Sequence, residues 1–401
     1  MKRLIGCTAA LCLLALMVGC GGTSSTGTLA YISNSAGTGF TVFTVNTDGT
    51  LTRNSISPQN TPTPSGDGPQ VLEFSANGKW AYFLDQAGLT IFAYTRAGNG
   101  TLSTEIQAGG YPTGPKASSL VITPNNNFLY VALPESQNLA IYSIDQSTGI
   151  LSQVGSNLQL GYTITQLIMA PTGGVLYGLA PKQQAVLAWT INSSSGVLTG
   201  PTPYAVGSSP ATDGMILSQN GLYMYVLDTQ DVGPNSFGIN TPSIYAFNVS
   251  NAVLSIMAGQ PFHGNVDPIH AIPPSIPVAG ATSNDNRYLF ITNQGSHNIS
   301  VFKISSTTGE PTEVLGSTTT VNGVATSTAS PFPCGSNTPP LCTPSFAAVT
   351  GANNGLYVLD NPAGRVYQFQ IDQNTGRLRA QNPAYVTAES TTSAPSWITI
   401  R

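Results

Sequence analysis

Histidine is the side chain that most often carries acid–base chemistry near neutral pH, and this 401-residue chain contains three. His263 and His270, with Asp267 between them, fall in one predicted loop, residues 257–276. By residue type they are the best general-base candidates. Their spacing implies no partner, so ordinary exposed loop histidines are the alternative. The members of a Ser-His-Asp triad meet only in space, but the sequence contains no Gly-x-Ser-x-Gly turn.

Side-chain oxygens recur three residues after a repeated aromatic residue, at Asn34, Asp85, Asp228, Asn293 and Asp360. A ring of such oxygens at one level could hold a cation. Asn and Asp are also favoured at strand ends, because their side chains bond the backbone of the adjoining turn. The Asp-x-x-Thr-Gly segments at 145–149 and 372–376 lack the ligand pattern of an EF-hand and are predicted to be hairpin turns. We therefore expect no metal or other cofactor, with a calcium site as the alternative.

The elements that must position these residues are short β-type runs, clearest at residues 118–151, where three apolar runs are separated by turn residues. The unit recurs with an aromatic residue in its second run. These aromatics are Tyr31, Tyr82, Tyr130, Tyr177, Tyr225, Phe290 and Tyr357. Seven repeats of four strands, mostly about 48 residues long and without a helical stretch, predict an all-β, seven-bladed β-propeller over residues 28–401.

A proline precedes the aromatic at a constant distance in three repeats, at Pro69, Pro277 and Pro344, and Pro395 begins a matching run at the end of the chain. The first repeat lacks such a run, and the run after Pro395 has no blade of its own. We therefore predict that the C-terminal strand completes the N-terminal blade. Closing the ring in this way removes the exposed strand edges that favour aggregation.

Charged residues make up only 7% of the chain, against about 25% in an average soluble protein. The formal net charge is −4 and no stretch clusters Lys or Arg, so nucleic-acid binding is excluded. Ser, Thr, Asn and 42 Gly must cover the surface instead, and these residues suit strands and turns.

The N-terminus carries Lys2-Arg3, an apolar run over residues 4–18, and Cys20. The run is too short for a permanent membrane span and predicts a cleaved export signal over residues 1–19. Its end resembles a bacterial lipoprotein signal, in which Cys20 is lipidated after cleavage. Residues 20–27 then form a flexible tether. We expect an exported cell-envelope protein held to a membrane at Cys20, most simply an outer-membrane lipoprotein facing the periplasm or the exterior; an ordinary signal peptide is the alternative.

Cys7 and Cys12 would leave with the signal, so Cys334 and Cys342 remain. Two nearby thiols in an exported protein most simply form a disulfide. Closing so small a loop contributes roughly 2.5 kcal/mol on the chain-entropy model. A metal site is the weaker alternative, because no His or second Cys pair lies nearby in the sequence.

In a propeller, the loops between second and third strands share one face with the loops between blades. Three long insertions, 229–242, 257–276 and 314–343, fall on that face, where binding usually resides. Neutral drift of loop length is the alternative. The ligand-binding candidates are Asp67, Lys116, Asp213, Asp228, Asp231 and Asp360.

The repeat, with its signatures at 130–133 and 290–293 and its trailing Asp-x-x-Thr-Gly-x-Leu, resembles the lactonase-type family of seven-bladed propellers. That family includes 6-phosphogluconolactonases, cycloisomerases and many exported proteins of unknown role. Its enzymes often carry Gly-Pro-Arg-His at the start of a strand. Here Gly68-Pro69 is kept, but Gln70 and Val71 replace the Arg and His.

This departure favours a non-enzymatic, lipid-anchored platform that binds a protein or carbohydrate partner on its loop-rich face. The alternative is a lactone hydrolase acting on an unphosphorylated exported substrate, with His270 or His263 as base. A third hypothesis is a cation-dependent carbohydrate binder.

Overall fold

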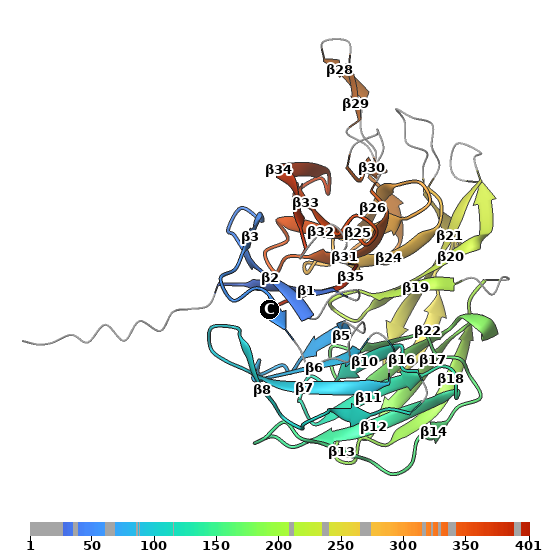
Figure 1. The fold of residues 1–401 in the computed structure, drawn as a ribbon. Coiled ribbons are helices and arrows are strands. Elements are labelled where there is room, and N and C mark those ends of the chain that lie inside the picture. Colours follow the sequence, from blue (N-terminus) through green and yellow to red (C-terminus); the bar gives the residue numbers. More distant parts are fainter. Residues whose placement is uncertain are drawn as a thin grey trace, which may run out of the picture.

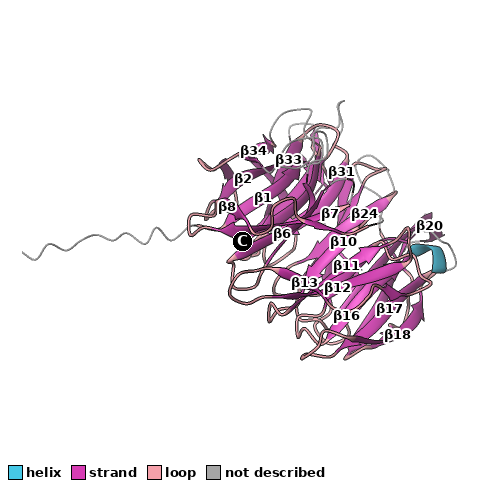
Figure 2. Cartoon of the chain, turned by 60° about the horizontal axis from the view of Figure 1, so that its bottom comes forward, coloured by secondary structure: helices cyan, strands magenta, loops and turns pink. Residues whose placement is uncertain are grey.

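The computed structural model describes residues 27–34, 39–60, 69–85, 87, 89–114, 116–207, 212–234, 240–264, 274–314, 318–321, 324–327, 330–335, 342–388 and 394–401. Seven antiparallel sheets, the blades, are arranged around a central axis (Figure 1). Strands dominate the described chain, and its one short helical segment is the 3-10 turn η1 (Pro181–Gln183) (Figure 2). The all-β, seven-bladed prediction is confirmed. Among these residues no helix is long and apolar enough to cross a membrane.

We number the blades 1 to 7 by the chain order of their second strands. The innermost strands, in blade order, are β35 (Pro395–Ile400), β5 (Pro69–Phe74), β10 (Ser119–Ile122), β15 (Gln166–Met169), β19 (Thr212–Leu217), β24 (Pro277–Thr282) and β31 (Pro344–Val349). The second strands are β1 (Leu29–Asn34), β6 (Trp80–Asp85), β11 (Phe128–Leu133), β16 (Val175–Ala180), β20 (Tyr223–Pro234), β25 (Tyr288–Asn293) and β32 (Gly355–Asp360).

The outer strands complete each blade in the same order. The third strands are β2 (Gly39–Val45), β7 (Thr90–Arg96), β12 (Asn138–Ile144), β17 (Ala185–Ile191), β21 (Asn240–Ser250), β26 (Asn298–Ile304) and β33 (Arg365–Ile371). The fourth strands are β3 (Leu51–Arg53), β8 (Leu102–Glu105), β13 (Leu151–Gln153), β18 (Leu198–Ala205), β22 (Val253–Ile256), β27 (Pro311–Glu313) and β34 (Leu378–Thr387). Five blades add a short strand beside the third: β4 (Gln59–Asn60), β9 (Tyr111–Pro112), β14 (Leu158–Gln159), β23 (Phe262–His263) and β30 (Phe332–Pro333).

The ring closes as the sequence predicts, because β35 pairs antiparallel with β1 and forms the innermost strand of blade 1. The backbones of Leu29 and Arg401 exchange two hydrogen bonds of 2.7 Å. Each proline that the sequence analysis placed before an aromatic is the first residue of an innermost strand. The C-terminus therefore lies beside blades 1 and 2 (Figure 1).

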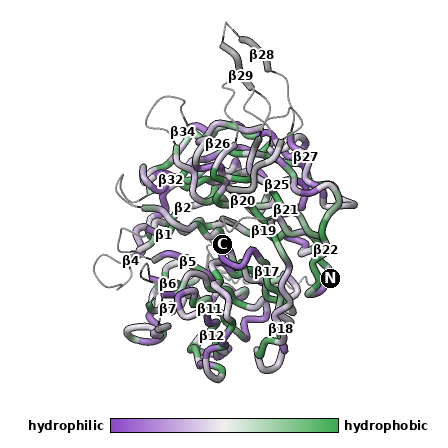
Figure 3. The backbone as a smooth tube through the Cα atoms, turned by 90° about the vertical axis from the view of Figure 1, so that its right-hand side faces the viewer, coloured by the Kyte–Doolittle hydropathy of each residue, from purple (hydrophilic) through white to green (hydrophobic). Residues whose placement is uncertain are grey.

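The recurring tyrosines also link neighbouring blades, because each tyrosine hydroxyl donates a hydrogen bond to a hairpin-turn carbonyl of the next blade. Tyr130, for example, donates to the Gly196 carbonyl at 2.8 Å. The other bonds run from Tyr31 to Gly100, Tyr82 to Gly149, Tyr177 to Asn251, Tyr225 to Gly309, and Tyr357 to Gly49. Phe290 in blade 6 has no hydroxyl. Apolar side chains on both sides of each junction form the core, and apolar segments alternate with polar ones along the chain (Figure 3).

Tyr130→Phe is expected to lower the free energy of unfolding by roughly 1–2 kcal/mol, because it leaves the buried Gly196 carbonyl without its donor. Urea denaturation followed by fluorescence measures the change. Tyr204→Phe is a matched control with a smaller expected loss, since the Tyr204 hydroxyl donates to Ala252 where water can replace it. Equal stability of wild type and Tyr130→Phe would contradict this role.

All three long insertions contain strands as well as loop, and 257–276 includes β23. Strands β20 and β21 extend into 229–242, where the sequence predicts a loop, and pair there through Val232 and Pro242. Within 314–343, β28 (Thr318–Val321) and β29 (Val324–Ser327) form a separate two-stranded sheet that projects from the body (Figures 1 and 3). The predicted signal peptide and Cys20 lie outside the described residues, and lipid anchoring stays a prediction.

Candidate functional site

The innermost strands of all seven blades line a central channel of about 400 Å³. One residue from each strand contributes to its wall at a common level: Trp397, Val71, Ser119, Gln166, Gly214, Ala279 and Phe346. Val71 occupies the position at which family enzymes often carry a histidine, and this position faces the channel. None of the described lining residues is charged.

Phe346 and Trp397 provide the aromatic part of the channel wall, with ring centroids 4.5 Å apart. Both side chains are only half-buried. The Trp397 indole donates to the Thr399 hydroxyl at 3.0 Å, and that hydroxyl donates to the Leu72 carbonyl at 2.7 Å. These bonds fix the indole ring, so the channel presents a rigid flat apolar surface.

Three titratable residues gather where blades 6 and 7 meet, at the end of the channel where β31 begins. Asp360 ends β32 opposite Pro344 and is 1% exposed, Arg365 begins β33, and His297 lies in the β25–β26 turn. Burial raises the pKa of Asp360, while backbone N–H groups of Thr343 and Ala363 and the charges of Arg365 and His297 act to lower it. The three residues therefore place titratable groups at this end, the mouth of the channel, although none of them is part of the channel lining.

The disulfide predicted from the cysteine spacing is present, and it holds His297. Cys334 and Cys342 are bonded, with Cα atoms 5.5 Å apart. The Cys334 backbone N–H donates to the His297 carbonyl at 3.0 Å, and His297 Nδ1 lies 2.7 Å from the Cys342 carbonyl oxygen. Because a carbonyl only accepts, Nδ1 must carry the proton in this contact. In the neutral ring the lone pair then lies on Nε2, as a general base requires.

Arg365 is oriented by two tyrosines of blade 7. Its guanidinium carbon lies 4.5 Å from the centre of the Tyr385 ring, and Nη1 donates to the Tyr367 hydroxyl at 3.4 Å. The hydrogen bond that Arg365 donates to Tyr367 is the main reason that the pKa of Arg365 is raised. This keeps a fixed positive charge beside Asp360 and His297 at the mouth.

Glu73 is a second candidate base, near the opposite end of the channel. Burial raises its pKa to about 7, and the positive charge of Arg401 opposes that shift. Arg401 donates to the Ser75 carbonyl at 2.8 Å, which places it at the end of β5 away from Pro69. Glu73 itself is not among the residues that line the channel, whereas Val71 is.

The other residues singled out from the sequence are scattered. His263 lies on β23 with Nδ1 3.1 Å from the Thr241 carbonyl oxygen, away from the channel wall. Asp228 is fully buried in the middle of β20, and Lys116 is exposed just before β10. Asp213 lies on β19 and Asp231 on β20, and the structure describes only the backbone at these two positions. His270, Asp267 and Asp67 lie outside the described residues.

The recurring Asn and Asp positions behave as strand-end and turn residues. Asp85 accepts from the backbone N–H groups of Leu89 and Thr90, and Asn293 donates to side chains of β26. Asp145 likewise accepts from its own hairpin turn, which lowers its pKa. The turn interpretation is confirmed for Asp85 and Asp145, whereas Asn293 bonds side chains of the neighbouring strand. Among the described residues, no group of three or more His, Cys, Asp or Glu is placed to hold a metal ion.

Comparisons with known proteins agree with this architecture. Residues 38–212 match the family described as "Lactonase, 7-bladed beta-propeller". A 6-phosphogluconolactonase of Serratia proteamaculans (strain 568) is 31% identical over 98 residues, which cover 23% of this chain and 30% of that protein. The match thus spans less than a third of the length of the curated relative.

Solved structures show the fold alone, because their identities are low. A candidate 6-phosphogluconolactonase of Bacteroides uniformis has a TM-score of 0.68 at 13% identity, covering 94% of this chain and 100% of its own. The periplasmic gluconolactonase of Pseudomonas aeruginosa has a TM-score of 0.62 at 15% identity, covering 93% and 98%.

The comparisons support a lactonase-type propeller fold, and none of them supports the binding or assembly platform. The resemblance stated from the repeats is confirmed: the chain matches the lactonase family of seven-bladed β-propellers over residues 38–212 and has that propeller fold around the whole ring.

Proposed function

We propose that the protein hydrolyses an uncharged lactone at the channel mouth between blades 6 and 7. The observation that carries this proposal is the tautomer of His297. Its contact with the Cys342 carbonyl keeps the proton on Nδ1, which leaves Nε2 as the basic nitrogen. Arg365 and Asp360 stand beside it, and Asp360 pairs with Pro344 at the start of β31, the strand that provides Phe346 to the channel wall. This replaces His263 and His270 as the proposed base.

In the proposed reaction, His297 Nε2 takes a proton from water while the water oxygen attacks the lactone carbonyl carbon. The ring C–O bond then breaks, and the imidazolium returns its proton to the leaving alkoxide, giving a hydroxy acid. The positive charge of Arg365 favours the oxyanion that forms on the carbonyl oxygen. When ionised, Asp360 stabilises the imidazolium. The balance requires only lactone and water.

The channel lining supports an uncharged rather than a phosphorylated substrate. A phosphate group in a confined site needs cationic partners to offset the desolvation of its negative charge. The described lining offers none that is charged, and the half-buried pair Phe346–Trp397 instead suits the apolar face of a ring. Of the substrates in the relatives' names, gluconolactone fits this lining better than its 6-phosphorylated form.

The test compares hydrolysis of glucono-1,5-lactone and 6-phosphoglucono-1,5-lactone in a pH-stat, after subtraction of the spontaneous rate. We expect kcat/KM for the uncharged lactone to be about tenfold higher or more, equivalent to at least about 1.4 kcal/mol. Trp397→Ala should raise KM for the uncharged lactone, and Trp397→Phe, which keeps a flat ring, should restore much of it. A preference for the phosphorylated lactone, or no turnover above the spontaneous rate across a lactone panel, would overturn the proposal.

A further inference from the structure

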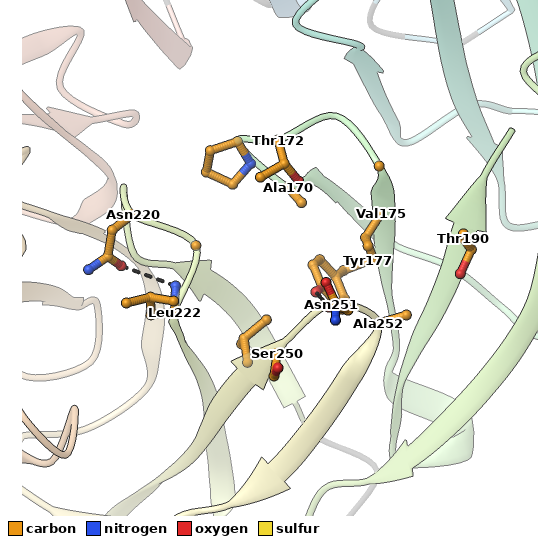
Figure 4. Close-up of a pocket in the computed structure, with 14 residues that line it drawn as sticks. Ala170, Thr172, Val175, Tyr177, Thr190, Asn220, Leu222, Ser250, Asn251 and Ala252 are labelled. Atoms are coloured by element: carbon orange, nitrogen blue, oxygen red, sulfur yellow. Dashed lines mark hydrogen bonds between the residues drawn. The ribbon is translucent and has the colours of Figure 1, made fainter. Parts of the chain in front are cut away.

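A second cavity lies between blades 4 and 5, on the face opposite the channel mouth. It has a volume of about 530 Å³ and is walled by the β15–β16 turn, the start of β16, the β19–β20 turn and the β21–β22 turn (Figure 4). We call it the blade 4–5 cleft. Val175 and Tyr177 form one side of it, and Asn251 and Ala252 come from the neighbouring blade.

At four other junctions this space is filled by an aromatic side chain, the first or nearly first residue of the second strand, packed on a turn glycine of the next blade. A Cβ atom added to Gly196, for example, would lie 2.4 Å from the Phe128 ring. The equivalent pairs are Trp80 with Gly149, Tyr223 with Gly309, and Tyr288 with Gly376.

The blade 4–5 junction departs from this pattern on both sides. The aromatic residue is replaced by Val175, and the turn between β21 and β22 is shortened to Asn251 and Ala252, with Asn251 at φ 53° in place of the glycine. Tyr177 still donates to the Asn251 carbonyl at 2.8 Å, so the blades remain joined. The cleft is therefore the space that an aromatic ring and a longer turn occupy at those four junctions; at the blade 1–2 and blade 7–1 junctions the equivalent residues are Leu29 and Gly355.

The chemistry of that missing ring can be read from its counterparts. Tyr223 donates to the Ser306 carbonyl at 3.3 Å, and Tyr288 is 3.5 Å from the Gln373 carbonyl, so a polar substituent meets turn backbone at those junctions. The cleft combines apolar walls, including Pro171 and Val175, with neutral polar groups such as Thr190. None of the described residues that line it is charged.

We infer that the blade 4–5 cleft binds an uncharged aromatic ring that carries a hydrogen-bonding substituent, such as a phenol or an indole. The ring takes the place that Phe128 or Tyr223 occupies at other junctions. Leu222, whose side chain is 50% exposed at the edge of the cleft, provides a further apolar contact. This site is separate from the channel and does not depend on the proposed lactone hydrolysis.

The test measures binding of p-cresol and indole to the full chain by ligand-observed NMR and calorimetry. Val175→Phe fills the cleft from within and should weaken p-cresol binding at least tenfold while raising the melting temperature. Trp397→Ala, in the channel, should leave binding unchanged. Benzoate should bind at least tenfold more weakly than p-cresol, because the lining provides no cation.

Should Val175→Phe fail to fold, Ala252→Trp fills the same space from blade 5 and gives the same test. N-acetyl-tyrosinamide distinguishes the source of the ring. If it binds as tightly as p-cresol, the ligand is a tyrosine side chain of a partner protein. If it binds more weakly than p-cresol, the ligand is a free phenol. Undetectable binding of p-cresol and indole up to their solubility, or binding that Val175→Phe and Ala252→Trp leave intact, would overturn the inference.

Discussion

A chain lacking residues 395–401 is expected to lose cooperative folding, because those residues are the innermost strand of blade 1. Thr399 pairs with Tyr31 in β1 and also donates to blade 2 through the Leu72 carbonyl. Ile398 is 4% exposed, and Trp397 packs against the cores on both sides of blade 2. Removing one buried Ile or Trp side chain costs about 2–5 kcal/mol, and a domain is stable by only about 5–15 kcal/mol.

Circular dichroism melting of chains 27–394 and 27–401 measures the effect. The matched control removes residues 318–327, a longer segment whose two strands pair only with each other. That deletion should leave the melting temperature nearly unchanged, since the hairpin projects from the body (Figure 1). An undiminished cooperative transition in 27–394 would show that blade 1 is stable without β35.

The repeat could be predicted from sequence because each blade repeats the same local pattern: a short apolar run, an aromatic and a turn glycine. What the pattern does not reveal is which copies meet. Tyr130 and Gly196 were both visible as repeat positions, but their contact spans 66 residues and joins two blades. Periodicity identifies the unit, whereas contacts between blades depend on how successive sheets pack against one another.

The candidate site was harder to predict from the sequence, because its residues are also brought together by contacts between distant segments. Asp360 was singled out as a recurring strand-end residue, but His297 was passed over in favour of histidines in a longer loop. The partner of His297 is the Cys342 carbonyl, 45 residues away and brought close by the disulfide loop. One signal was available: His297 follows the recurring aromatic Phe290 within a turn on the loop-rich face.

His297→Ala is expected to lower kcat for lactone hydrolysis by about 10²–10⁴-fold, the usual contribution of a positioned general base. KM should change little, because the aromatic wall of the channel is untouched. Steady-state kinetics with the uncharged lactone provides the measurement. Since His297 is partly exposed in a turn, the substitution should leave the melting temperature within a few degrees of wild type.

Glu73→Gln is the matched control, since Glu73 is the other candidate base associated with the channel and has a pKa raised to about 7. Turnover retained in Glu73→Gln and lost in His297→Ala places the base at the mouth; the reverse result would move it to the far end of the channel. The double variant Cys334→Ser with Cys342→Ser adds a graded test. It leaves the His297 ring in place but releases the carbonyl that selects its tautomer, so kcat should fall less than in His297→Ala while remaining below wild type.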